Sequence, residues 1–170
     1  MPAQLILPLE PQPNRGRADF IAAPGNAAAV GLVDAYPGWA APAAALCGPA
    51  ASGKTHLARI WAARSGAALA DARTLREPLP GAAVVENCDS VTGSDHEPAL
   101  FAMLARGTPL LLTGRAAPAH WRVALPDLAS RFRALIAFAL GEADEALLMA
   151  LAVKLFADRQ VMVPEAVVTR

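Results

Sequence analysis

Short apolar segments alternate with amphipathic ones along the chain from Asp19 onward. This alternation is typical of strand and helix units that follow one another around a parallel sheet. Five apolar segments have the length of strands, and they cover residues 43–47, 67–71, 82–86, 109–113 and 135–138. The pattern therefore predicts an α/β fold in which a five-stranded parallel sheet is flanked by helices.

Four helices are predicted: one over 27–36, one that ends at Arg64, one over 97–106 and one from about 142 to 158. Asn26 is a residue type that caps helices, so we expect it to cap the first. The last helix has an apolar stripe made of Leu147, Leu148, Leu151 and Leu155. A further helix starts near Pro164, which predicts a small helical unit over 141–170 that the chain holds only in part.

The beginning of the chain differs from the rest. Residues 2–17 hold four prolines and no helical periodicity, which favours an extended tail outside the core. The tail nevertheless contains the apolar run Gln4-Leu5-Ile6-Leu7-Pro8-Leu9, which a plain linker does not need. We therefore expect a tail over 1–17, a core over 18–140 and a partial helical unit over 141–170.

The strongest motif follows the first predicted strand. Its residues, Gly48-Pro49-Ala50-Ala51-Ser52-Gly53-Lys54-Thr55, satisfy the phosphate-loop pattern G-x-x-x-x-G-K-[ST] in full. The glycines allow close backbone approach to phosphate, and the N–H groups at the helix start attract anionic oxygens. Lys54 would supply a cation for the β- and γ-phosphates, and Thr55 would ligate Mg²⁺. A glycine-rich turn with an incidental lysine is the competing interpretation, and the presence of only one other lysine argues against it.

A nucleotide hydrolase also needs an acid at the end of a neighbouring strand, where it holds the water shell of Mg²⁺. Glu86 ends the third predicted strand and can serve the metal. Asn87 follows in the place of the acid that polarises water, and an amide cannot take up that proton. Asp89 lies beyond the strand and would substitute only if the loop turns back. We therefore expect slow or absent intrinsic turnover; alternatively, Glu86 and Asp89 merely solvate a loop.

Composition excludes several classes of function. Fifteen basic residues balance 15 acidic ones and are scattered along the chain, so a basic surface for direct binding of nucleic acid is not expected. No apolar run approaches the roughly 20 residues of a membrane span, and no signal-peptide pattern follows Met1. Cys47 and Cys88 are too few for a disulfide framework and are interpreted as small buried fillers. These features favour a cytoplasmic protein.

Three further segments carry a resemblance to one family. They are Asp19-Phe20-Ile21 followed by Pro24-Gly25-Asn26, then Leu110-Leu111-Leu112-Thr113-Gly114, and then Leu125-Pro126-Asp127-Leu128-Ala129-Ser130-Arg131-Phe132. Together with the phosphate loop, they make the chain similar to the AAA+ ATPases of the DnaA replication-initiator clade. Within that clade it most resembles the Hda family, short homologues that inactivate DnaA. The resemblance covers nearly the whole chain.

The resemblance implies bound ATP or ADP with Mg²⁺, and a role for single residues. Phe20, Ile21 and Asn26 would lie on the adenine side of the nucleotide. Thr113 would be the sensor at the end of its strand. Arg131 would be an arginine finger that reaches the γ-phosphate of a neighbouring subunit, and segment 141–170 would be part of a helical lid.

The chain departs from the family pattern at three places. Glu86 stands where Asp is commoner, and Arg115 stands where family members often carry a sensor acid. The sequence ends at Arg170, before the arginine that the family places in the lid. These departures put hydrolysis by the chain itself in doubt.

The resemblance also implies partners. The run from Gln4 to Leu9 looks like the peptide with which the Hda family docks on the DNA polymerase III sliding clamp. Gln4 would be a hydrogen-bonding anchor, Leu5, Leu7 and Leu9 would enter a groove, and Pro8 would limit the entropy lost on binding. The other partner would be DnaA, with self-association as a further expectation, and DNA would be reached only through the clamp. Alternatively, the tail folds back on the core.

Two other functions remain open at this stage. One is a stand-alone P-loop ATPase or small-molecule kinase, and the other is a degenerate initiator fragment with a structural role only. A kinase needs a lid rich in arginine, whereas segment 141–170 holds only Lys154, Arg159 and Arg170 as cations. Clamp binding separates the regulatory hypothesis from both alternatives.

Overall fold

The computed structural model describes residues 16–91 and 95–159 of the chain. Its strands are β1 (Ala43–Cys47), β2 (Ala68–Asp71), β3 (Ala83–Glu86), β4 (Leu110–Gly114) and β5 (Ile136–Ala139). Its α-helices are α1 (Ala27–Asp34), α2 (Lys54–Ser65), α3 (Glu97–Arg106), α4 (Pro126–Ala134) and α5 (Glu145–Asp158). Three short 3-10 helices are η1 (Arg17–Asp19), η2 (Cys88–Ser90) and η3 (Pro118–His120).

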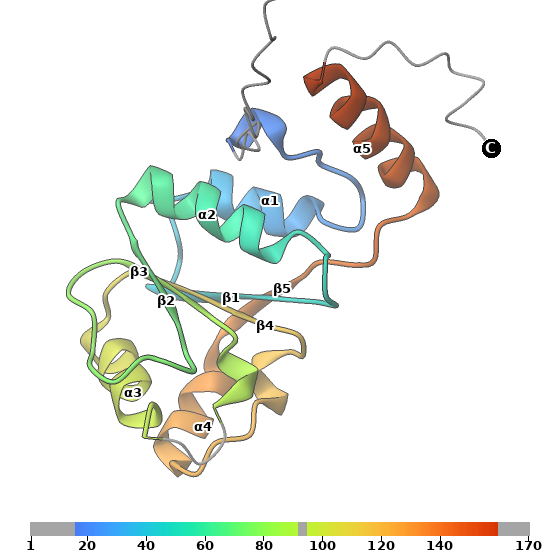
Figure 1. Cartoon of the computed structure of the whole chain (residues 1–170). Coiled ribbons are helices and arrows are strands. Elements are labelled where there is room, and N and C mark those ends of the chain that lie inside the picture. Colours follow the sequence, from blue (N-terminus) through green and yellow to red (C-terminus); the bar gives the residue numbers. More distant parts are fainter. Residues whose placement is uncertain (1–15, 92–94, 160–170) are drawn as a thin grey trace, which may run out of the picture.

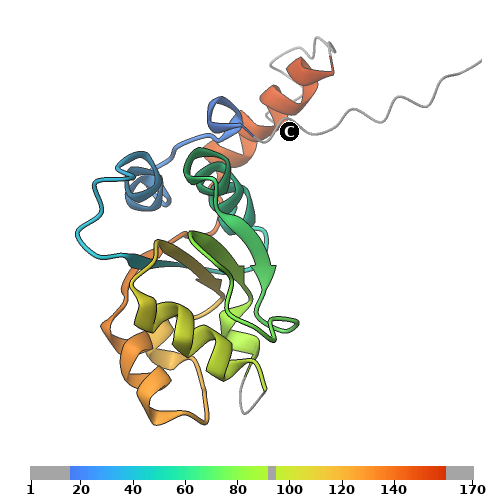
Figure 2. The ribbon, with the colours of Figure 1, turned by 90° about the vertical axis from the view of Figure 1, so that its left-hand side faces the viewer.

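The five strands form one parallel sheet in the order β2-β3-β4-β1-β5. Helices α1 and α2 cover one face, and α3 and α4 cover the other (Figure 1). The view turned by 90° shows the same layers, with α5 beyond the α1 and α2 side (Figure 2). The predicted α/β fold is confirmed. In open sheets of this kind, ligands bind at the carboxyl ends of the strands where the chain order reverses, which here is beside β1.

The central strands are buried because both faces of the sheet are covered. Residues 44–47 of β1, 83–85 of β3 and all of β4 are buried, and they are alanine, valine, leucine and cysteine apart from the end of β4. The α1 and α2 side packs around Leu46, Leu57 and Trp61. The α3 and α4 side packs around Leu112 and Phe132. Two separate cores therefore fix the sheet between its helix layers.

The two cysteines are buried, as predicted. Cys47 and Cys88 are buried and unpaired. Burial raises the pKa of both thiols above the ordinary value. They act as small apolar fillers at the end of β1 and at the start of η2.

Hydrophobic patterning locates each predicted strand to within one residue, and it places α3 at its observed ends. It does not predict α4, a short helix that starts with Pro126 at its first position. Helix α1 is shorter than predicted, because the chain turns after Asp34. The helix predicted near Pro164 and the tail up to residue 15 lie outside the described residues, so the division of the chain at 17 and 140 stays a prediction.

The four leucines predicted to form one stripe on α5 differ in burial. Leu147 and Leu151 line a pocket against the core, whereas Leu148 and Leu155 are 55% and 53% exposed. At about 100° per residue, the four leucines lie within one arc of the helix surface, and only the edge with Leu147 and Leu151 meets the core. The helix is tied to the core by Lys154, whose Nζ donates to Asp19 Oδ1 at 2.9 Å. None of the helices in the described part of the chain has the length and apolarity needed to cross a membrane.

Candidate nucleotide-binding site

The phosphate-loop motif forms the connection between β1 and α2 at the carboxyl end of the sheet. Gly48 has φ 152°, and a Cβ there would lie 2.2 Å from the carbonyl oxygen of Leu140. Gly53 has φ 93° and precedes the first residue of α2. Both positions therefore require glycine, and the loop brings the N-terminus of α2 to the strand ends.

Lys54 folds back over the loop that precedes it. Its Nζ donates to the carbonyl oxygens of Gly48 at 2.8 Å and Pro49 at 2.6 Å, and to Ser52 Oγ at 3.2 Å. Burial lowers the pKa of Lys54, and the carboxylate of Asp89 acts in the opposite direction. The ammonium group therefore lies at the centre of the loop, where the phosphates of a nucleotide would meet it.

The structure brings Thr55 and Glu86 together. Thr55 Oγ1 donates to Glu86 Oε1 at 2.6 Å, although 31 residues separate them in sequence. A hydroxyl and a carboxylate are the hard oxygen donors that Mg²⁺ prefers. Thr55 and Glu86 thus fit a Mg²⁺ ion and would hold it beside the phosphate loop.

Thr113 lies on the same side of the sheet as this pair. It is paired with Leu46 in the β1–β4 register, and Leu46 faces the core beneath α2. Residues alternate between the faces of a strand, so Glu86 shares that side with Val84, which also packs beneath α2. Sheet geometry therefore places Thr113 near the loop and near Glu86, as a sensor requires.

The loop after β3 turns back toward the phosphate loop. Asn87 adopts the left-handed conformation with φ 59°, and its Nδ2 donates to Asp71 Oδ2 at 2.8 Å. Asp89 Oδ2 then accepts from the backbone N–H of Arg115 at 2.7 Å, while the Arg115 carbonyl accepts from Gly48 N at 3.1 Å. The loop therefore turns back as Asp89 required, and it brings this acid near Lys54.

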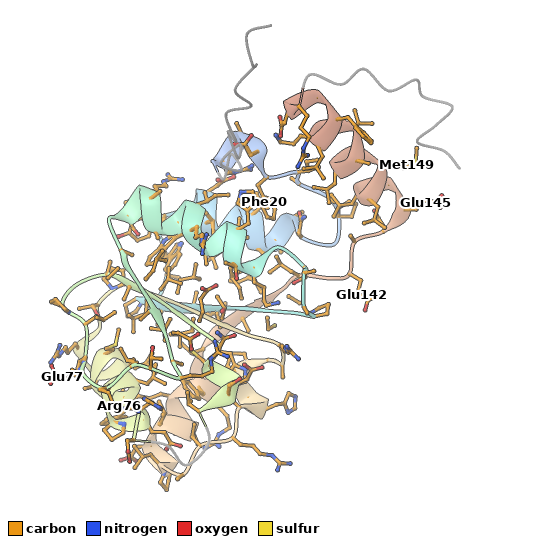
Figure 3. The ribbon with its side chains drawn as sticks, in the orientation of Figure 1. Phe20, Arg76, Glu77, Glu142, Glu145 and Met149 are labelled. Atoms are coloured by element: carbon orange, nitrogen blue, oxygen red, sulfur yellow. The ribbon has the colours of Figure 1, made fainter. Side chains whose placement is uncertain are left out.

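A pocket opens beside the phosphate loop. Its walls come from the segment before α1, from the loop and α2, and from the start of α5. The predicted adenine-side residues Phe20, Ile21 and Asn26 all line it, next to residues 51–53 of the loop. The Phe20 ring meets His56 edge-on at 5.2 Å and lies between α2 and α5 (Figure 3). The structure thus joins an apolar pocket to the phosphate loop.

Asn26 lines this pocket but does not cap α1 as predicted. It stands at the N-cap position of α1, but its side chain does not cap the helix. Its Oδ1 accepts from Ala23 N at 2.9 Å, and its Nδ2 donates to the Ile21 carbonyl at 3.1 Å. Both polar groups of this buried amide are therefore used to shape the segment that carries Phe20 and Ile21.

Sequence reasoning missed several pocket residues. His56 lines the pocket directly after Thr55, and its Nε2 is buried without a hydrogen-bond partner among the described residues. Asp144 caps α5 by accepting from Leu147 N at 2.8 Å, and it borders the same pocket. The feature of the sequence that could have indicated His56 as a pocket residue is its position in the first helical turn after the motif. Glu145 and Met149 lie on the opposite, outer side of α5 (Figure 3).

Arg131 lies away from this site. It belongs to α4, on the face of the sheet opposite α2 (Figures 1 and 2). Its guanidinium is exposed and lies over the Phe101 ring of α3, with Cζ 5.0 Å from the ring centroid. Within the described ranges it forms no ion pair, and the i,i−4 partner Asp127 does not bind it. The predicted tail residues Gln4, Leu5, Leu7, Pro8 and Leu9 lie outside the described part of the chain.

Together, the sheet, the glycine-rich loop between β1 and α2 and the acid at the end of β3 define a P-loop α/β fold. Comparison with solved structures makes this more specific, because domain III of the Thermotoga maritima replication initiation protein DnaA superposes with a TM-score of 0.73. That match has 17% sequence identity and covers 92% of this chain and 79% of the other. The chain has the DnaA-like AAA+ fold.

Two further structures agree on the fold. AMPPCP-bound DnaA from Aquifex aeolicus has a TM-score of 0.74 at 14% identity, and the match covers 93% of this chain and 59% of that one. The Thermotoga maritima RuvB Holliday junction branch migration motor has a TM-score of 0.56 at 18% identity, over 74% and 46% of the two chains. No protein-family model and no curated protein matches the sequence. At these identities the likeness shows the fold, and the chain spans about three fifths of the Aquifex protein.

Proposed function

We propose that the chain is a regulator of chromosome replication of the Hda type. It binds ATP or ADP with Mg²⁺, docks on the sliding clamp of DNA polymerase III through residues 4–9, and stimulates hydrolysis of the ATP held by DnaA. Arg131 is the arginine finger that it supplies to DnaA. The observation that carries the proposal is the separation of two features: a complete phosphate loop on one side of the sheet and, on the other, an exposed Arg131 that has no ion pair among the described residues.

Nucleotide binding is supported by the pocket and the phosphate loop, which adjoin each other. The loop N–H groups, Lys54 and the N-terminus of α2 provide positive potential for phosphates. The pocket beside them is lined by Phe20, Ile21 and Leu151, which suit the flat, apolar faces of a base. The Mg²⁺ ion would neutralise phosphate charge when bound, held by Thr55 and Glu86. The AMPPCP-bound Aquifex DnaA has the same fold, which supports the same ligand class here.

The action in trans is supported by the position of Arg131. A finger that serves another subunit must be exposed and must not be neutralised by its own chain. Arg131 meets both conditions among the described residues, and α4 carries it on the far face from the chain's own loop. An arginine delivered in this way stabilises the charge on the transferring phosphoryl oxygens.

The proposal is tested by measuring hydrolysis of DnaA-bound ATP with this protein and with clamp loaded on DNA. We expect stimulation only when both are present. Stimulation without the clamp would remove clamp docking from the mechanism, and no stimulation in the complete mixture would overturn the regulatory function.

Replacing Gln4 and Leu7 together with alanine is expected to remove clamp binding. The change takes away the hydrogen-bonding anchor and one apolar side chain of the predicted peptide, and tail residues outside the core should not affect its unfolding. Surface plasmon resonance with immobilised clamp measures the binding, and the melting temperature should stay unchanged. The matched control is Gln12→Ala, in the same tail outside the peptide; clamp binding by the double variant equal to wild type would give the tail another role.

Intrinsic ATP turnover by the isolated protein is expected to be slow. Asn87 cannot accept a proton from water, and its amide is bound to Asp71, whose pKa is lowered to about 2 chiefly by the hydrogen bond from Arg73. Steady-state phosphate release measures the rate, with Lys54→Ala as the background. Turnover in the usual range of about 1 s⁻¹ or more would contradict the expectation and would favour a stand-alone ATPase, for which Asp89 would be the acid.

A further inference from the structure

We propose that Phe101 on α3 is a positioning residue for Arg131. This inference rests on the proposed function, because it concerns how the finger is presented to the nucleotide of another subunit. Phe101 and Arg131 lie far apart in sequence. They are in contact because α3 and α4 pack side by side on the same face of the sheet.

The start of α4 is held by α3 through a buried carboxylate. Glu97 is 1% exposed, and its Oε1 and Oε2 both lie 2.9 Å from the Ala124 N–H that donates to them. Its Oε2 also accepts from Leu125 N at 2.8 Å. Burial of a carboxyl group is tolerated only when it forms such hydrogen bonds. The two N–H groups immediately precede α4, so this contact fixes where the helix begins.

The body of α4 is fixed by its apolar side. Leu128 and Phe132 are buried in the core on this face, with Leu128 fully enclosed. These two residues are spaced i,i+4 and therefore point to one side of the helix. With its start bound to Glu97 and one side in the core, α4 presents the remaining side, which includes Arg131, in a fixed direction.

Phe101 fixes the side chain itself. It stands four residues after Glu97, so both project from the same side of α3. Its ring lies under the Arg131 guanidinium at 5.0 Å, within the range of a cation–π contact. An arginine side chain has many rotamers, and a stack on a ring restricts them without neutralising the charge. Phe101 thus does what an acidic partner could not do: it orients the guanidinium and leaves it able to bind phosphate oxygens.

The test compares Phe101→Leu with Phe101→Tyr in the assay of DnaA-bound ATP hydrolysis with clamp-loaded DNA. Leucine keeps an apolar side chain but removes the ring face, whereas tyrosine restores it. We expect Phe101→Leu to lower the kcat of stimulated hydrolysis at least about 2- to 5-fold, the range for an exposed cation–π contact, with the apparent affinity for DnaA unchanged. Phe101→Tyr should regain the wild-type kcat. Phe138→Leu, another partly buried ring on the opposite face, is the control for a general packing effect.

A second measurement uses the isolated protein. A ring face shifts the NMR resonances of the arginine side chain above it, and Arg131→Lys identifies which resonances belong to Arg131. We expect the shift in wild type and in Phe101→Tyr, and its loss in Phe101→Leu. A wild-type spectrum without the shift, an undiminished kcat in Phe101→Leu, or equal losses in the leucine and tyrosine variants would each overturn the inference. Failure of the wild-type protein to stimulate hydrolysis at all would instead overturn the proposed function itself.

Discussion

Nucleotide binding is expected to be lost when Lys54 is replaced with alanine. The ammonium group lies at the centre of the loop, at hydrogen-bonding distance from three of the loop's oxygens, and phosphate oxygens would take over its donors when a nucleotide binds. A hydrogen bond to a charged group contributes about 1.5 to 3 kcal/mol, so the loss of two such contacts should lower affinity about 100-fold or more. Isothermal titration calorimetry with Mg²⁺ and ATP or ADP measures the change.

The contacts of Lys54 also fit a structural role, in which its hydrogen bonds to the loop oxygens stabilise the conformation of the loop. The two roles give different results. If the role is structural, Lys54→Ala should lower the melting temperature and retain nucleotide affinity. If Lys54 binds phosphate, the variant should lose nucleotide affinity and keep its fold. Arg64→Ala is the matched control, because Arg64 lies at the other end of α2 and binds the Asp34 carbonyl. Wild-type affinity in Lys54→Ala would remove the phosphate loop from the proposed function.

The parts of this site that could be predicted from the sequence are local ones. A strand, a glycine-rich loop and a helix start are consecutive in sequence. The sequence of residues 43–55 therefore determines the local conformation, including the positive φ of Gly53. The pairing of Thr55 with Glu86 also follows, because parallel strands end at the same edge of the sheet. Adjacent strands β1, β4 and β3 bring those ends together without any special loop.

The parts that could not be predicted depend on loops and on which face of an element packs. Asp89 returns to the phosphate loop only because Asn87 takes a left-handed conformation, which is uncommon outside glycine. Ala51 is the other such residue outside glycine in the described ranges, and it also lies in this site. For α5, composition indicates an apolar helix but not which part of its apolar surface meets the core, since most positions are alanine, leucine or valine.

The Phe101 contact shows the same limit at a longer range. The motif that identified Arg131 contains Asp127 at i,i−4, and local spacing alone favours an ion pair between them. In the structure Arg131 turns instead to a ring thirty residues earlier, on a separate helix. Periodicity along one helix cannot reveal a partner on another helix.

Arg131→Ala is expected to abolish the stimulation of DnaA-bound ATP hydrolysis while leaving the protein folded. An arginine supplied in trans contributes about 1,000-fold or more in rate, because it stabilises charge that develops on the phosphoryl oxygens in the transition state. The side chain is exposed and binds only Phe101 in the described part of the chain, so its removal should change the free energy of unfolding by about 1 kcal/mol or less. Nucleotide affinity and clamp binding should stay at wild-type values.

Arg133→Ala is the control that separates a finger from a general loss of positive charge. Arg133 is also exposed and lies two positions further along α4, which directs it to the other side of the helix. If the charge of the helix surface were sufficient, the two variants would lose stimulation equally, and the effect of each would decrease with added salt. A finger requires one guanidinium at one place, so Arg131→Ala should lose activity at every salt concentration and Arg133→Ala should retain it. If Arg131→Ala keeps its stimulation but unfolds at a lower temperature, the contact with Phe101 is structural and the proposed regulator has no catalytic group.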